Sequence, residues 1–325
     1  MSKKPADKLA AKRAAWLERT MRALGADETE TLKLLEQTRQ QSIRLNPLVA
    51  APEDTLEWLN KLGWQGRPFV WAPNCYSAEA GLEAVRDSEL VESGAVYIQN
   101  AASWLPVLML EPQPGEAILD VCAAPGGKAS HIAAITGNDA SLAVNDNSRA
   151  RLAKLQSNLS RLGVVAEYSL FDARQLARKF EGRQFDKILL DAPCSGEGMM
   201  RYSNDKDFAT WSVAHIKRLE SLQKQIILQA WQLLKPGGTL VYSTCTMAPE
   251  ENEAIVDYLL RKATDAAIEP ITFAVQSRVP AVTSWNGRPY KSNLQGCLRL
   301  RPHPLLEAFF VCSLKKLASK KETML

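Results

Sequence analysis

Ala117-Ile-Leu-Asp-Val-Cys-Ala-Ala-Pro-Gly-Gly-Lys-Ala-Ser130 is the stretch of sequence that decides the fold. Residues 117–121 form a short, almost continuously apolar run, as in a buried strand, and a helical pattern begins after the two glycines. A strand that enters a helix through a turn of small residues is the opening unit of a doubly wound sheet. Because ligands of such sheets bind beyond the carboxyl ends of the strands, this turn is the first candidate for a binding site.

The same alternation of strand and helix continues along the rest of the chain. Further strands are expected at 142–145, 166–170, 187–190 and 239–243, and helices near 127–136, 148–162, 211–234 and 250–262. Short apolar strands alternating with helices predict a parallel sheet covered on both faces, the α/β, Rossmann-like class. The segments 268–274 and 308–314 are expected to complete this sheet at one edge.

A smaller α+β region is expected ahead of this sheet. Leu32, Leu35 and the aliphatic stem of Arg39 recur at helical spacing, which predicts a helix over 28–41. The other elements expected here are a helix over 7–24, a helix near 51–62, strands at 68–71 and 97–99, and an apolar helical turn at 104–110. With a boundary between 90 and 110, we expect a first region of residues 1–100, a sheet domain of residues 101–314 and a basic tail of residues 315–325.

The composition is that of a globular protein with a nearly balanced charge. The 325 residues are 46% hydrophobic and 23% charged, which excludes disordered, collagen-like and fibrous chains. The net charge of +4 is uneven, because residues 1–22 carry +5, residues 315–325 carry +3 and the body between them carries −4. Basic ends are typical both of solvated tails and of arms that bind nucleic acid, so charge alone leaves both interpretations open.

The sequence favours neither a membrane protein nor a secreted one. It has no run of about 18 apolar residues and no apolar segment of the signal-peptide kind near its start. The six cysteines are widely spaced and form no Cys-x-x-Cys pair, so structural zinc and a disulfide framework are poor interpretations. We therefore expect a protein of the reducing cytoplasm.

Three successive strand ends suggest a nucleoside cofactor. The turn after residue 121 lacks both the Gly-x-Gly-x-x-Gly fingerprint and the Walker pattern, which disfavours a dinucleotide or a nucleoside triphosphate. Asp146 ends the next strand and suits the hydroxyls of a ribose, while Asp172 ends the third and can accept a hydrogen bond from an adenine amine. Either aspartate alone is more often a cap or turn residue. Together with a turn that lacks a phosphate anchor, they predict S-adenosylmethionine.

The fourth and fifth strands end in a carboxylate and two thiols. Asp191-Ala-Pro-Cys-Ser follows the fourth strand, Ser243-Thr-Cys-Thr246 ends the fifth, and Asp191, Cys194 and Cys245 should converge beside the cofactor. Carbon 5 of a pyrimidine is a poor nucleophile until a thiolate adds to carbon 6, which gives a methyltransferase a use for these thiols. Asp191 would lie by the ring nitrogen, and Lys128 is a plausible cation to lower the pKa of a thiol.

These motifs closely resemble those of the Nol/Nop/Sun family of RNA cytosine-5 methyltransferases. The resemblance covers roughly residues 40–314, and the first region looks most like the bacterial branch that acts on small-subunit ribosomal RNA. It is carried by Asp120-x-Cys-Ala-Ala-Pro-Gly-Gly-Lys128, Asp191-Ala-Pro-Cys-Ser-Gly-Glu-Gly198, Tyr242-Ser-Thr-Cys-Thr246 and Glu250-Glu251-Asn252-Glu253, with Arg44-Leu-Asn46, Tyr97-Ile-Gln99 and Arg301-Pro-His303 as shorter matches.

The resemblance implies a role for each site residue. Cys245 is implied as the nucleophile at carbon 6, Cys194 as the residue that releases the product, and Asp191 as a contact of the cytosine ring and the cofactor. It implies no metal. The residues implied to hold S-adenosylmethionine are Cys122, Ala123, Ala124, Pro125, Gly126, Gly127, Lys128, Asp146, Asp172 and Asp191.

Two departures from the family pattern bear on the RNA substrate. Glu307-Ala308 stands where an acidic residue is usually followed by glycine, which affects the last strand turn. Longer bacterial relatives carry a C-terminal RNA-binding domain, whereas this chain ends eleven residues after Leu314. Either RNA docks on the first region, as an RNA-positioning region, and on the basic ends, or the chain is a short variant.

Several basic residues are candidates for phosphate contacts, although each alone is more often a surface charge. They are Arg44, Arg67, Arg201, Lys291, Arg299 and Arg301. We expect a monomer that acts on RNA, with ribosomal RNA or the small subunit favoured and transfer RNA as an alternative. A uracil-5 methyltransferase and a non-catalytic RNA-binding assembly factor are the other hypotheses, and Asp191 with two thiols argues against both.

Overall fold

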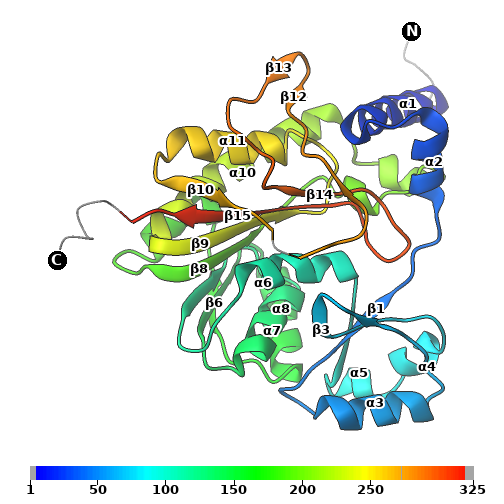
Figure 1. Ribbon diagram of the computed structural model, residues 1–325, viewed down its shortest axis with the longest axis vertical. Coiled ribbons are helices and arrows are strands. Elements are labelled where there is room, and N and C mark those ends of the chain that lie inside the picture. The colour runs from blue at the N-terminus through cyan, green and yellow to red at the C-terminus, as the bar shows by residue number, and fades with distance from the viewer. Residues whose placement is uncertain (1–4, 272, 319–325) are drawn as a thin grey trace.

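The computed structural model describes residues 5–271 and 273–318 (Figure 1). Its first part contains two helices and a small antiparallel sheet with short helices around it. The elements of this part are α1 (Pro5–Leu24), α2 (Glu28–Glu36), β1 (Ser42–Leu45), α3 (Pro52–Lys61), β2 (Pro68–Phe69), β3 (Ala72–Ser77), α4 (Leu82–Arg86), α5 (Glu89–Glu92) and β4 (Val96–Gln99).

The second part contains the large sheet and its helices. Its helices are α6 (Leu105–Leu110), α7 (Gly127–Thr136), α8 (Arg149–Arg161), α9 (Leu176–Lys179), α10 (Val213–Leu233) and α11 (Glu253–Lys262). Its strands are β5 (Ala117–Asp120), β6 (Ser141–Asp146), β7 (Glu167–Leu170), β8 (Phe185–Asp191), β9 (Leu234–Thr244), β10 (Ala266–Glu269), β11 (Arg278–Val279), β12 (Ser284–Trp285), β13 (Arg288–Pro289), β14 (Leu298–Leu300) and β15 (Phe309–Lys316). Within the described ranges, no helix is long and apolar enough to cross a membrane.

The large sheet confirms the predicted α/β class. Its order is β11-β14-β15-β9-β8-β5-β6-β7, and β10 also pairs with β15. The five strands from β9 to β7 are parallel, so their carboxyl ends lie at one edge. The pairs Asp120↔Leu189 and Asp191↔Ser243 fix the register at that edge.

The far side of the sheet differs from the prediction of a parallel sheet. The expected strand at 308–314 is β15, which pairs antiparallel with β9 and lies inside the sheet rather than at its edge. The expected strand at 268–274 is shorter and is observed as Ala266–Glu269. Lys315 and Lys316, expected in a basic tail, are the last residues of β15. The chain turns back after β14 and continues as β15, which runs antiparallel to β9. The rule behind the prediction of a parallel sheet applies to strand–helix–strand units and does not cover such a return.

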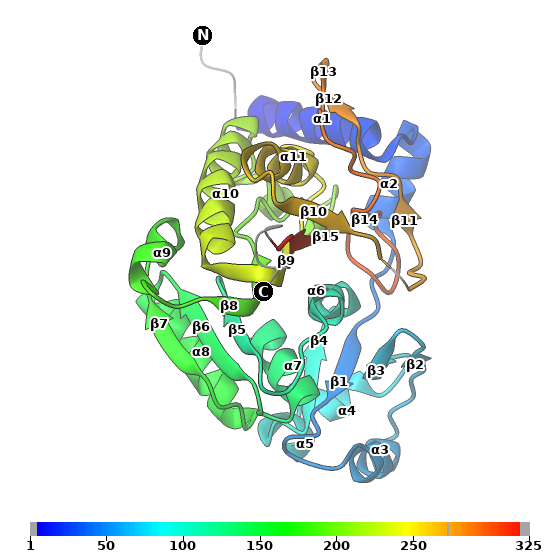
Figure 2. The same ribbon diagram turned by 60° about the vertical axis from the view of Figure 1, so that its left-hand side comes forward.

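Two apolar cores cover the two faces of the large sheet. Figure 2 shows α10 and α11 on one side of the sheet and α7 with α8 on the other. The core on the α7 side also contains Ala72 and Cys75 of β3, so one face of the small antiparallel sheet packs on it, whereas Ile43, Leu45 and Val96 of that sheet belong to a separate core with α3. The strand order of that small sheet is β2-β3-β1-β4.

Helices α1 and α2 do not join the small sheet. Trp16 and Leu35 are buried with Phe208 and Met247 of the large domain, and the Trp16 and Phe208 rings meet edge to face at 5.3 Å. Figure 1 shows both helices at the far end of the molecule from α3. Helix α2 ends at Glu36 instead of 41, so Arg39 lies after the helix, where its guanidinium donates to the carbonyls of the 199–200 turn.

Candidate active site

The turn after β5 is held between the large domain and the small sheet. Gly126 has φ of +107°, and a Cβ there would lie 3.0 Å from Leu155 and 3.1 Å from Leu159 of α8. Both its backbone conformation and this close approach require glycine. A Cβ on Gly127 would lie 3.1 Å from the Tyr97 ring of β4. The small sheet therefore shapes the turn directly.

A cavity of about 420 Å³ connects this turn to the two thiols. The residues that line it include Cys122, Ala124, Pro125, Asp146, Asp172, Asp191, Cys194 and Cys245. A smaller hollow of about 140 Å³ lies beside it and is lined by Tyr97, Gln99, Ala123, Gly127, Lys128 and Asp191. Since the parallel strands end at one edge, residues from five strand turns share these two spaces.

The two carboxylates predicted to bind the cofactor, Asp146 and Asp172, have different hydrogen-bond partners. Asp146 accepts from the Ser148 N–H at 3.0 Å and pairs with Arg151 at 3.1 Å, and its side chain is almost fully buried in the cavity wall. Asp172 accepts from the backbone and guanidinium of Arg174, and these hydrogen bonds lower the pKa of its carboxyl. Asp172 therefore also acts as the turn cap that is its commoner role.

An ion pair lies between the cofactor turn and the fourth strand. Lys128 Nζ is 2.7 Å from Asp191 Oδ2, and Ser243 donates to Asp191 Oδ1 at 2.7 Å. Burial lowers the pKa of the Lys128 ammonium, but the attraction of Asp191 outweighs it and the pKa is raised overall. Lys128 thus stays charged, with Asp191 rather than a cysteine as its direct partner.

The two thiols on the neighbouring strand turns are in contact. Cys194 Sγ and Cys245 Sγ are 3.2 Å apart, and both are partly exposed to the cavity. The hydrogen bond to Cys245, together with burial, raises the pKa of the Cys194 thiol well above its usual value. Either sulfur can be the donor in this contact, which joins the turns after β8 and β9.

The other cysteines have no such setting. Burial and the charge of Asp120 raise the pKa of the Cys122 thiol, although it lines the cavity. Cys75 of β3 is fully buried in the core that also contains residues of α7, and burial raises the pKa of its thiol to about 12. Cys297 and Cys312 are buried in the core under α10 and α11. Cys75, Cys297 and Cys312 are packing residues, as expected, whereas Cys122 stays a predicted cofactor contact.

A group of polar residues beneath the thiols was not predicted from the sequence. Ser195 and Thr246 each follow one of the cysteines, and their hydroxyl oxygens are 2.7 Å apart. Each also contacts a buried glutamate, Glu251 or Glu197. The available signal was a hydroxyl residue directly after each cysteine.

Two of the predicted phosphate contacts are wrong. Arg44 is 1% exposed and donates to Ser130 Oγ at 2.7 Å, and Arg299 is 2% exposed and pairs with Glu253 at 2.6 Å. A guanidinium enclosed in the core cannot reach an RNA backbone. Each arginine contacts an internal partner that is distant in sequence, and a local sequence pattern cannot predict such a partner.

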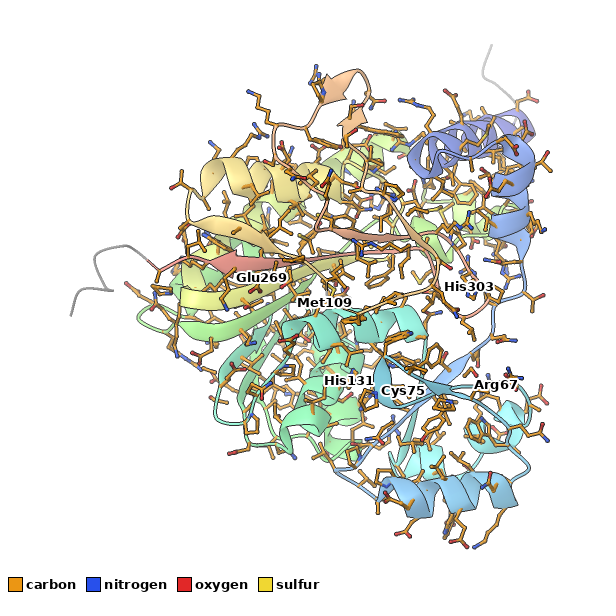
Figure 3. The ribbon with its side chains drawn as sticks, viewed as in Figure 1. Arg67, Cys75, Met109, His131, Glu269 and His303 are labelled. Carbon is orange, nitrogen blue, oxygen red and sulfur yellow. The ribbon has the colours of Figure 1, made fainter. Side chains whose placement is uncertain are left out.

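The remaining candidate cations are at the surface. Arg67 lies on the outer side of the small sheet (Figure 3) and pairs with Glu79 at 2.9 Å, while Arg301 pairs with Glu30 at 2.8 Å. Lys291 is exposed and Arg201 is half-buried. These four residues remain predicted RNA contacts.

The basic ends are only partly described. Lys12 of α1 donates to the Phe208 carbonyl, Arg13 pairs with Asp205, and Arg19 pairs with Glu250 at 2.8 Å. These three charges attach α1 to the large domain, so they are not a free arm. Of the other basic residues expected to dock RNA at the two ends, Lys3, Lys4, Lys320 and Lys321 lie outside the described residues. Lys8 and Arg22 belong to α1, and Lys315 and Lys316 belong to β15.

The donor set of the cavity fits S-adenosylmethionine. Asp146 sits at the second strand end, where a ribose is expected, and the turn between Cys122 and Lys128 leaves a space that a Cβ on Gly127 would reduce. The cavity continues to the thiols, so a bound methyl donor and a base held at the thiols would lie in the same cavity.

Three comparisons with known proteins bear on this site. The family model described as 16S rRNA methyltransferase RsmB/F matches residues 107–315. A tRNA (cytosine(49)-C(5))-methyltransferase from Pyrococcus abyssi is 41% identical over 225 residues, which cover 69% of this chain and 71% of that protein. Ribosomal RNA small subunit methyltransferases F from Vibrio parahaemolyticus and Klebsiella pneumoniae are 34% and 37% identical over 93% and 86% of this chain. The chain spans 63% and 58% of the length of these two relatives.

Solved structures share the whole architecture. A methyltransferase homologue from Pyrococcus horikoshii has a TM-score of 0.77 and 29% identity, and covers 93% of this chain and 99% of its own. NSun6 from the same organism has a TM-score of 0.78 at 24% identity and covers 94% of this chain and 98% of its own. The fold, including the part before the large sheet, is therefore shared with these proteins.

Proposed function

The chain belongs to the 16S rRNA methyltransferase RsmB/F family, and from this premise we propose that it methylates carbon 5 of a cytosine in small-subunit ribosomal RNA. Family membership confirms the predicted class, an RNA methyltransferase that depends on S-adenosylmethionine. The observation that carries the finer proposal is the contact of Cys194 with Cys245 in the cavity of the cofactor turn. A methyltransferase acting on an amine or a hydroxyl has no use for two thiols there.

In the proposed reaction Cys245 forms a covalent bond with the base. Its thiolate adds to carbon 6 of the cytosine, and the electron pair moves toward the ring nitrogen and carbon 5. The Lys128–Asp191 pair lies in the wall next to this space and would stabilise the charge that develops on the ring. S-adenosylmethionine supplies the methyl group when bound.

Release requires that the adduct be broken. The proton on carbon 5 leaves to a base, its electron pair restores the double bond between carbons 5 and 6, and the Cys245 thiolate departs. Cys194 Sγ lies 3.2 Å from that sulfur, so we assign Cys194 to this release step. Reaching the base also requires a target that is flipped or single-stranded.

Covalent trapping tests this assignment. Cys194→Ala protein incubated with RNA and S-adenosylmethionine should accumulate an RNA adduct that survives denaturing electrophoresis, because release is lost. Cys245→Ala should form no adduct and no product. Cys312→Ala, a buried cysteine in the other core, is the matched control and should behave as the wild type. Methylation by Cys245→Ala would contradict the nucleophile assignment.

Transfer RNA is the second candidate substrate. The observation that favours it is the 41% identity to the tRNA methyltransferase, which exceeds the identity to the two ribosomal RNA enzymes. Bisulfite sequencing of ribosomal and transfer RNA from cells with and without the gene separates the two. Loss of a 5-methylcytosine from 16S RNA supports the first substrate, and loss only from transfer RNA supports the second.

A further inference from the structure

The turns that carry the two thiols are joined by hydroxyl groups. Ser195 directly follows Cys194 at the end of β8, and Thr246 directly follows Cys245 at the end of β9. The Ser195 Oγ and Thr246 Oγ1 atoms are 2.7 Å apart, a normal distance for a hydrogen bond between hydroxyls. The bond therefore bridges the same two turns as the sulfur contact above it.

A glutamate continues the chain at each end. Ser195 Oγ lies 2.5 Å from Glu251 Oε1, and Thr246 Oγ1 lies 3.1 Å from Glu197 Oε2. Glu251 and Glu197 are 0% and 3% exposed. We refer to Glu251, Ser195, Thr246 and Glu197 as the hydroxyl chain.

Counting protons shows that one glutamate carries a proton. The hydroxyl chain has three oxygen–oxygen contacts, and each needs one hydrogen. The two hydroxyls of Ser195 and Thr246 supply two hydrogens, so the third must come from a carboxyl group at one end. Burial raises the pKa of the Glu251 carboxyl to about 7 and raises that of Glu197, in line with this count.

The outer oxygens of both glutamates are already fixed. Glu251 Oε2 accepts from the Ser195 N–H at 3.0 Å and from Gln223 Nε2 at 2.9 Å. Glu197 Oε1 accepts from the Trp211 indole N–H at 2.8 Å. Only the inner oxygens exchange a hydrogen with the hydroxyls, so the hydroxyl chain has a fixed length between two anchored ends.

We propose that the hydroxyl chain, with its single shared carboxyl proton, positions the Cys194 and Cys245 sulfurs in contact. The proposal rests on the function proposed above, because it gives these thiols their use. Each hydroxyl belongs to the residue next to a cysteine, so sliding one turn past the other stretches the Ser195–Thr246 bond and separates the sulfurs together. The four residues are positioning residues, since none of them lines the 420 Å³ cavity among the residues described.

The first test measures the sulfur contact without RNA or cofactor. Diamide oxidises the two thiols to a disulfide, and mass spectrometry of the peptides gives the rate. Thr246→Val and Ser195→Ala remove a hydroxyl and should each slow the reaction at least about tenfold. Thr246→Ser retains the hydroxyl and should stay within about threefold of the wild type. Equal rates for Thr246→Val and the wild type overturn the proposal.

The second test uses the proton count at constant side-chain volume. In Glu197→Gln the amide oxygen can accept from Trp211 while the amide N–H donates to Thr246, which reproduces the protonated acid. In Glu251→Gln the amide N–H can likewise donate to Ser195, which reverses the direction of the hydrogen bonds along the hydroxyl chain. Each single variant should keep the disulfide rate within about threefold. The double variant has a donor at both ends and should lose at least about tenfold.

Methyl transfer by the same variants links the chain to the reaction. Loss in Thr246→Val should appear in kcat, with KM for S-adenosylmethionine within about twofold, and Thr246→Ser should restore it. The proposal is overturned if the fold loss in rate of the double glutamine variant is no larger than the product of the fold losses of the two single variants. This comparison requires that each variant has the melting temperature of the wild type. A wild-type protein that forms the disulfide rapidly but methylates no cytosine refutes the proposed function and leaves the positioning role intact.

Discussion

Glu251 and Glu253 are two residues apart in one acidic run, and both are completely buried, yet their surroundings differ in kind. Glu253 faces a cation, because Arg299 donates to both of its oxygens at 2.8 and 2.6 Å. Glu251 is surrounded by neutral donors from Ser195 and Gln223. The first arrangement ties α11 to β14, and the second holds the turn that carries Cys194.

The difference shows how to tell a stabilising charge from a functional one in this protein. A glutamate that accepts two hydrogen bonds from a buried arginine is fixed in place, so its contribution is to the stability of the fold. A glutamate that is buried among neutral donors has a raised pKa and can share a proton. The second kind lies next to the thiols, and the first kind lies away from them.

The largest expected effect comes from breaking the Glu253 pair. Arg299→Met leaves Glu253 buried without a cation, and we expect the free energy of unfolding to fall by about 3–5 kcal/mol. Urea denaturation at pH 7 measures this. Adding Glu253→Gln should recover much of the loss, since no charge then remains. A weakened RNA affinity at unchanged stability would instead restore Arg299 as a phosphate contact.

The next effect concerns pH and Glu251. Its pKa is about 7 in the folded protein against a usual 4.5, so the unfolded chain loses this proton first as pH rises. Stability is therefore lost between about pH 4.5 and 7, by about 3 kcal/mol for this group. Glu251→Gln should flatten the fall in unfolding free energy over that range. Parallel curves for the wild type and the variant would contradict a raised pKa.

The smallest effect belongs to Glu250, the first glutamate of the same run. Its pair with Arg19 joins α1 to the large domain, and both side chains keep some exposure. Arg19→Met should cost about 1 kcal/mol in urea denaturation, because water can replace the lost partner. Arg22→Met is the control and should cost less, because it loses a 3.2 Å contact to Asn286 and a cation–π contact at 4.5 Å from the Trp285 ring rather than a carboxylate partner. If Arg19→Met lowers the free energy of unfolding as much as Arg299→Met does, solvent exposure does not determine how much each ion pair contributes to stability.

The site could be predicted from the sequence where its geometry follows from the sheet. Asp146, Asp191, Cys194 and Cys245 all follow parallel strands, so one topological rule brings them to a common edge. The same rule places the glycine turn beside them. For these residues a local pattern and a fold class were sufficient.

Other features depend on partners that are distant in sequence. Arg44 and Arg299 look like surface cations until Ser130 and Glu253 are found beside them. The position of β15 inside the sheet depends on how the chain returns after β14, which has no local signature. Helix α2 was predicted too long because Arg39 matches the spacing, although it turns instead to the 199–200 carbonyls.

The core shared by the small sheet and the cofactor turn has a consequence for unfolding. Ala72 and Cys75 of β3 pack in the same cluster as Ala129 and Ile132 of α7. Strand β3 cannot leave this core without exposing apolar surface of α7, so we expect the two elements to open together. Calorimetry should show one transition for both regions, and amide protons of β3 and α7 should exchange with solvent at the same rate under conditions where exchange needs their joint opening.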